Sequence, residues 1–117
     1  VPGLAERWFS PTFIAEDPMW LDTLMEVLAD TDADSYAKCC EALGAFDVRD
    51  DLKNVSVPTL VIAGDHDPSI SADQVRELMT GLPNAKLFVV EGGFHLCVVD
   101  FPELSASALN TFWSSIH

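Results

Sequence analysis

Two short apolar runs, each ended by glycine, constrain the fold of this chain more than any other feature. One run covers residues 59–63 and stops at Gly64; the other covers residues 86–90 and stops at Gly92-Gly93. Continuous runs of this kind, rich in β-branched and aromatic residues, are typical of strands that are buried on both faces of a sheet. The sequence therefore predicts two buried strands.

Helical patterns follow each predicted strand. Apolar residues at helical spacing predict one helix from residue 71 or 72 to Thr80, and a second from residue 101 or 102 to Ser115. A strand, a helix and a second strand joined by so short a crossover imply parallel strands with a right-handed connection. The predicted fold class is α/β.

The first half of the chain is helical in pattern and rich in acidic residues. We expect a separate helical segment over residues 1–53, ahead of a β-α-β-α unit over residues 54–117. The elements expected in the helical segment are a helix opened by Asp17-Pro18, a helix over about 35–43 with an acidic cap from 30–34 and Gly44 as its C-cap, and a polar connector over 47–52.

The charge balance argues against one class of partner. The chain carries 19 acidic and 6 basic residues, which give a formal net charge of −13. Binding to a nucleic acid needs clustered Lys and Arg against the phosphates, and the basic residues here are scattered. We therefore expect no nucleic-acid partner.

Neither a membrane segment nor a disulfide framework is expected. No apolar run approaches the roughly 20 residues that cross a bilayer, and the N-terminus lacks the pattern of a secretory signal. Cys39 and Cys40 are adjacent and point about 100° apart on a helix, which makes them poor disulfide partners. With Cys97 they are expected to be buried thiols in a reducing compartment, so the predicted location is cytoplasmic.

The loops after the two predicted strands hold the candidate catalytic residues. The first loop offers Asp65, His66 and Asp67, and the second offers His95. Loops at the carboxyl ends of parallel strands open on the same edge of the sheet, so a carboxylate and an imidazole from them can meet. A serine nucleophile requires such a pair, because the imidazole accepts the hydroxyl proton and the carboxylate fixes the imidazole tautomer.

Two segments of the second half resemble α/β-hydrolases. Residues 57–67, VPTLVIAGDHD, resemble the segment of that family that ends in the triad acid. Residues 92–96, GGFHL, followed by an acid-x-Pro at 100–102, resemble its histidine loop. The resemblance implies that Asp67 is the triad acid and that His95 is the triad histidine.

The first half resembles a narrower group. Residues 4–11, 36–42 and 47–49 look like the cap-domain end of 3-oxoadipate enol-lactonases, which hydrolyse a small anionic enol-lactone without a cofactor. The resemblance covers nearly the whole chain but corresponds to only the last part of such an enzyme. It implies the C-terminal part of an α/β-hydrolase fold, preceded by cap-domain helices.

The nucleophile that this family needs does not occur in the 117 residues. α/β-Hydrolases carry it ahead of the acid and the histidine, in a G-x-S-x-G turn, and no serine here lies in such a turn. We expect the chain to be inactive alone, and to act on a small-molecule substrate only when a nucleophile-bearing half completes it. Two strands alone leave unpaired edges, so self-association or docking onto such a half is also expected.

The candidate residues have simpler roles as alternatives. Asp67 could cap the helix that follows it. Asp65, His66, Asp67 and His95 could in principle hold Zn²⁺ or Mn²⁺, but no helical His-x-x-x-His spacing or Cys pair supports a metal, and none is expected. Asp65 is expected to shape its loop and His66 to face solvent, while Cys97 shares a loop with His95 and is expected to pack rather than attack.

Six residues of the first half are candidates for substrate contact. The aromatic residues Trp8, Phe9, Trp20 and Tyr36 could line a pocket under the cap, with Trp8 and Tyr36 as the preferred pair, although aromatic residues at helical spacing are more often part of a core. Arg7 and Arg49 could pair with a substrate carboxylate, and surface salt bridges are the expected role for each.

Overall fold

The computed structural model describes residues 3–16 and 18–117. Asp17, expected to open a helix, lies outside the described residues, and the helix starts at Pro18. None of the helices in the described ranges combines the length and apolar character needed to span a bilayer. In chain order the elements are α1 (Ala5–Trp8), α2 (Pro11–Glu16), α3 (Pro18–Ala29), α4 (Ala33–Ala45), the 3-10 helix η1 (Arg49–Asn54), β1 (Thr59–Gly64), α5 (Ala72–Gly81), β2 (Ala85–Val90), α6 (Cys97–Asp100) and α7 (Pro102–Ile116).

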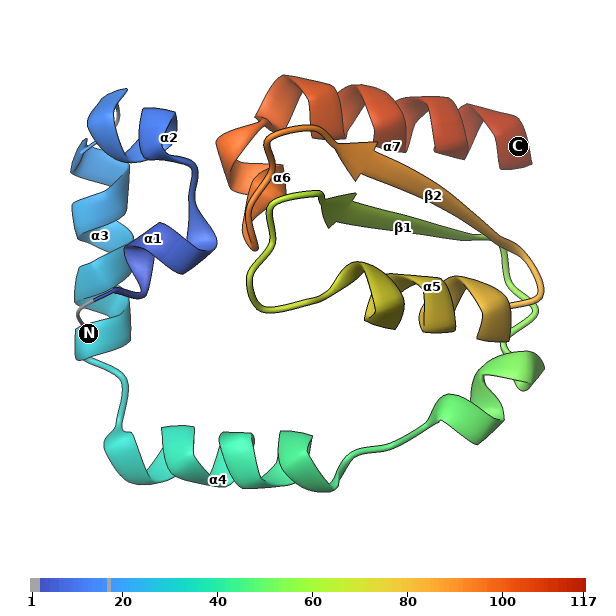
Figure 1. Cartoon of the computed structure of the whole chain (residues 1–117), viewed down its shortest axis with the longest axis horizontal. Coiled ribbons are helices and arrows are strands. Elements are labelled where there is room, and N and C mark those ends of the chain that lie inside the picture. Colours follow the sequence, from blue (N-terminus) through green and yellow to red (C-terminus); the bar gives the residue numbers. More distant parts are fainter. Residues whose placement is uncertain (1–2, 17) are drawn as a thin grey trace.

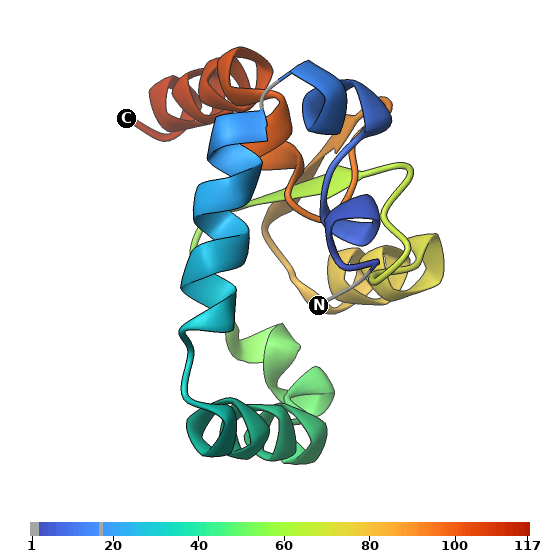
Figure 2. The same cartoon turned by 90° about the vertical axis from the view of Figure 1, so that its left-hand side faces the viewer.

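The two predicted strands form a parallel pair, which confirms the α/β class. Their register runs from Thr59 opposite Ala85 to Gly64 opposite Val90. α5 connects the strands, and α5 and α7 lie on opposite sides of them (Figures 1 and 2). Because the strands are parallel and in register, the loops that follow them leave the same edge of the sheet.

The strands are less buried than their apolar sequences predict. All six residues of β1 are half-buried, and in β2 only Val90 is fully buried while Val89 is half exposed. The prediction of burial on both faces is therefore wrong for the described chain. The physical reason is that two strands and two helices supply too few neighbours to cover both faces of the sheet.

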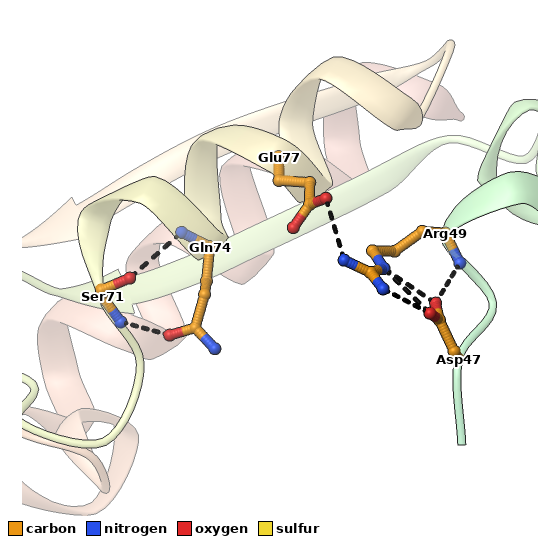
Figure 3. Close-up of polar contacts among 5 residues, drawn as sticks. All are labelled: Asp47, Arg49, Ser71, Gln74 and Glu77. Atoms are coloured by element: carbon orange, nitrogen blue, oxygen red, sulfur yellow. Dashed lines mark hydrogen bonds and ion pairs between the residues drawn. The ribbon is translucent and has the colours of Figure 1, made fainter. Parts of the chain in front are cut away.

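The acidic N-cap predicted for α4 is confirmed, whereas the sequence did not single out the residue that caps α5. Ser71 Oγ accepts the Gln74 backbone N–H at 3.2 Å, and Gln74 Oε1 accepts the Ser71 N–H at 2.8 Å, a capping box at the start of α5 (Figure 3). Asp32 caps α4 by accepting the Ser35 N–H at 2.9 Å. The prediction of Gly44 as a C-cap is wrong, because the helix continues through Ala45.

Residues 47–52, expected as a polar connector, lead into and form most of η1, and an ion pair connects this segment to α5. The Arg49 guanidinium donates to both carboxylate oxygens of Asp47 and lies 3.6 Å from Glu77 Oε1 of α5 (Figure 3). Its hydrogen bonds lower the pKa of Asp47 to about 2. Arg49 therefore has the surface ion-pair role expected for it.

α4 differs from the other helices because every one of its residues is exposed. Both views place it away from the two strands (Figures 1 and 2). Cys39 and Cys40 on this helix are exposed, so the prediction of buried thiols is wrong for them and holds for Cys97 alone. Periodicity identified the helix, but within the described ranges no element covers its apolar stripe.

Close approach of two backbones brings the loops after β1 and β2 together. A methyl group on Gly64 would collide with the Gly93 carbonyl and would lie 2.7 Å from the Phe94 oxygen. The His66 N–H donates to the same Gly93 carbonyl at 2.9 Å. Only glycine at position 64 permits this contact.

We expect Gly64→Ala to lower the free energy of unfolding by about 1–3 kcal/mol, because the added Cβ forces the two loops apart. Gly44→Ala is the matched control: nothing lies within 4 Å of its added Cβ, and because Gly44 is the second-last residue of α4, the alanine should stabilise the chain by less than the roughly 0.5–1 kcal/mol of a helix interior. Urea unfolding followed by circular dichroism measures both. Equal effects of the two substitutions would contradict the close-approach argument.

Candidate active site

The structure brings together the two residues that the sequence singles out. Asp67 lies in the loop after β1, and His95 in the loop after β2. His95 Nδ1 is 2.9 Å from Asp67 Oδ2. The Asp67 side chain is one-tenth exposed and that of His95 about one-third exposed. A partly sheltered carboxylate thus holds an imidazole that still reaches the surface.

The loop after β1 orients the Asp67 carboxylate. Asp67 Oδ1 accepts the backbone N–H groups of Ser69 at 2.7 Å and Ile70 at 3.1 Å. This turn leaves Oδ2 for His95. The alternative role of Asp67 as the cap of the following helix is wrong, because Ser71 caps α5.

Asp65 links the two loops, which confirms its expected role. Its Oδ1 accepts the Gly92 N–H at 2.7 Å, and Gly92 turns the chain after β2 with a φ of 75°. The same oxygen lies 2.7 Å from His66 Nδ1. The hydrogen bond with His66, with a smaller contribution from Gly92, lowers the pKa of Asp65 despite partial desolvation. The His66 side chain is 61% exposed and faces solvent as predicted.

A segment from the start of the chain supports the histidine loop. The Leu96 N–H donates to the Trp8 carbonyl at 2.8 Å, and the His95 N–H lies 3.5 Å from the Arg7 carbonyl. Asp100 Oδ2 accepts the Ser10 N–H at 2.8 Å. The sequence did not predict this role of Asp100, although the residue belongs to the acid-x-Pro pattern at 100–102.

Hydrogen bonding decides the charge state of the Asp67 carboxyl. Burial alone would raise its pKa, but the hydrogen bonds from His95 and from the Ser69 and Ile70 N–H groups outweigh burial and lower it. A charged carboxylate at Nδ1 favours the imidazole tautomer with its proton on Nδ1. Nε2 of His95 then carries the lone pair, and it has no partner among the described residues.

Two cavities include residues of these loops in their lining. One of about 330 Å³ has Asp67 and His95 at its polar end and is otherwise lined mainly by apolar residues of β1 and α5. Another of about 1080 Å³ is lined by Phe13, Phe94 and Phe101, with His66 and the candidate Trp20 among its other lining residues. The cavity of about 330 Å³ therefore lies beside the His95 imidazole.

The other candidates take different positions. Trp8 is half-buried beside the histidine loop, whereas Tyr36 is half exposed on α4, away from the strands (Figure 1). Neither lines the two cavities described above, and their contact with a substrate stays a prediction. Cys97 is buried, and burial raises the pKa of its thiol, which fits a packing role. Within the described ranges, no three His, Cys, Asp or Glu residues cluster as metal ligands would.

Because the pKa of Asp67 in the folded chain lies below its ordinary value of 3.8, its charge stabilises the fold above pH ~4. That contribution is lost as the pH falls through the folded pKa. We expect Asp67→Asn to lower the free energy of unfolding by about 1 kcal/mol at pH 7 and by less near pH ~3. Urea unfolding at both pH values measures this.

Asp22→Asn is the control, since Asp22 is an exposed carboxylate of α3 and its loss should change stability by less than about 0.5 kcal/mol. A loss for Asp67→Asn that is equal at both pH values would contradict the assigned charge state.

Comparison with known proteins places the chain among hydrolases. It is 39% identical to 3-oxoadipate enol-lactonase 2 of Acinetobacter baylyi over 99 residues, which cover 85% of the chain and 37% of that protein. It is 36% identical to 3-oxoadipate enol-lactonase 1 of the same organism, over 94% of the chain and 41% of the relative. Non-heme chloroperoxidase CPO-A1 of Kitasatospora aureofaciens is 32% identical over 68% of the chain and 28% of its own length.

The chain thus spans about two-fifths of the length of the two enol-lactonases, and the matches cover their C-terminal part. No family model and no solved structure matches the chain. The strand order, the acid and histidine loops and these relatives agree: the chain belongs to the α/β-hydrolase superfamily, where it resembles the C-terminal part of 3-oxoadipate enol-lactonases.

Proposed function

We propose that Asp67 and His95 are the acid and the general base of a serine-hydrolase triad that opens a small anionic lactone or ester. The observation that carries this proposal is the 2.9 Å contact between His95 Nδ1 and Asp67 Oδ2, which leaves Nε2 unpartnered among the described residues. Nε2 is the atom that a nucleophile would have to meet. The enol-lactonase relatives support the choice of substrate class.

The chemistry assigns each atom a task. Nε2 of His95 accepts the proton of a serine hydroxyl while the serine oxygen attacks the acyl carbon, and the Asp67 carboxylate stabilises the imidazolium. The imidazolium then returns the proton to the leaving oxygen, and water hydrolyses the acyl-serine by the same route. The serine comes from a G-x-S-x-G turn outside these 117 residues.

The test joins this chain to the part of the Acinetobacter enol-lactonase 2 that precedes its matched region. We expect the hybrid to hydrolyse the enol-lactone, and His95→Ala to lower kcat by about 10³-fold or more. His66→Gln is the matched control, since His66 is a solvent-facing imidazole one residue from the acid, and it should retain most of the activity. Equal activity of His95→Ala and the parent hybrid would refute the proposal.

A second proposal concerns the same chain as an association module, without catalysis of its own. Its accessible surface is 8277 Å², whereas a compact chain of 12.8 kDa exposes about 6,300 Å². Its radius of gyration is 16.1 Å, against about 13 Å for a compact domain of this length. The excess surface is of the size that stable protein interfaces bury, and it supports either self-association or docking onto a hydrolase half.

We expect the isolated chain to sediment as a dimer or larger species at high micromolar concentration, because half-covered strands expose apolar surface and an open edge. Sedimentation velocity over a range of concentrations measures the species. The hybrid described above is the control, since it provides the missing part of the sheet, and it should sediment closer to a monomer. A monomeric isolated chain that unfolds cooperatively would rule out the association module.

A further inference from the structure

Arg7 touches both loops that carry the Asp67–His95 pair. Its Nη2 lies 3.4 Å from the Pro68 carbonyl oxygen and 3.5 Å from Ser69 Oγ, in the loop directly after Asp67. At its other end, its carbonyl oxygen faces the His95 N–H at 3.5 Å. The guanidinium of Arg7 therefore lies at the loop that follows Asp67, and the Arg7 backbone lies at the loop of His95.

Arg7 differs from the other two arginines because the structure gives it no ion pair with a carboxylate among the described residues. Arg49 pairs with Asp47 and Glu77, and Arg76 pairs with Asp73. Across residues 3–16 and 18–117, Arg7 has no carboxylate within 4.0 Å, even though acidic residues outnumber basic ones by 19 to 6, so the surface salt bridge expected for it is wrong for these residues. Its two neutral partners lie at the long end of the hydrogen-bond range, and the guanidinium presents five N–H donors.

We infer that Arg7 determines specificity by binding the carboxylate of an anionic lactone or ester while the scissile carbonyl lies toward His95. This inference rests on the proposed function and names the group of the substrate that the site recognises. The planar fork of a guanidinium matches a carboxylate in two parallel hydrogen bonds. Within these 117 residues, of net charge −13, a guanidinium without a carboxylate partner among the described residues is a favourable place for an anionic group.

A purely structural role of Arg7 makes a different prediction. If the guanidinium served only to hold the loop of Pro68 and Ser69, its loss would disturb the Asp67–His95 pair for every substrate. If it binds a carboxylate, its loss would affect charged ligands far more than neutral ones. The charge selectivity of the site therefore separates the two roles.

The first experiment measures binding to the 117-residue chain by NMR titration, with tetrahydrofuran-2-acetate as a ring that cannot be hydrolysed and its amide as the neutral match. We expect a carboxylate-dependent shift of the Arg7 side-chain Nε–H, and a Kd that rises about tenfold, or ~1.4 kcal/mol, in Arg7→Gln. Arg76→Gln, which removes the same charge from α5, should leave the Kd unchanged. Binding of the amide as tight as that of the acid, or no shift at Arg7, would overturn the inference.

The second experiment compares kcat/KM of the hybrid for the anionic enol-lactone and for a neutral ester. Arg7→Gln should lower the anionic-to-neutral ratio about tenfold. An unchanged ratio with both values reduced would assign Arg7 a structural role and overturn the inference. A hybrid that hydrolyses neither substrate counts against the proposed function, and the titration still decides the role of Arg7.

Discussion

The contact between the ends of β1 and β2 is the constraint on which the candidate site depends. Gly64 lies opposite Val90 in the parallel register, and its missing side chain leaves room for the backbone of Gly93 and Phe94. With the two backbones this close, Asp67 and His95 leave the sheet edge side by side. The 2.9 Å contact between them is therefore a consequence of strand register and one glycine.

Hydrogen bonds within the two loops orient the Asp67 carboxylate and favour its charged form. Asp67 uses one oxygen for the Ser69 and Ile70 N–H groups and the other for His95. Together these hydrogen bonds overcome the cost of partial burial and lower the pKa of the carboxyl. Asp65 fixes the spacing of the loops independently, through the Gly92 N–H. Local contacts thus hold the His95 imidazole with Nδ1 against the Asp67 carboxylate, although the sheet that supports the two residues has only two described strands.

The sequence predicted the features that rest on local pattern and simple topology. The β-branched runs located both strands, and the parallel geometry then placed Asp67 near His95. Burial could not be predicted in this way, because it depends on what covers a face: β1 is half-buried and Cys39 is exposed despite their apolar patterns. α6 has four residues, too few for periodicity to reveal. The bond from Ser10 to Asp100 joins residues 90 positions apart and has no local signature.

Contacts across the predicted boundary at 53/54 connect the helical segment to the loop of His95, one residue of the candidate catalytic pair. The Trp8 carbonyl accepts a hydrogen bond from the Leu96 N–H, and the Asp100 carboxylate accepts one from the Ser10 N–H. These two hydrogen bonds connect residues 8–10 to the histidine loop. Arg7 belongs to the same stretch and reaches the loop of the acid. A change in the position of α1 would therefore move the guanidinium and the imidazole together. Because the segment that carries Arg7 is hydrogen-bonded to the loop that carries His95, the fold itself sets the distance between the Arg7 backbone and the proposed base.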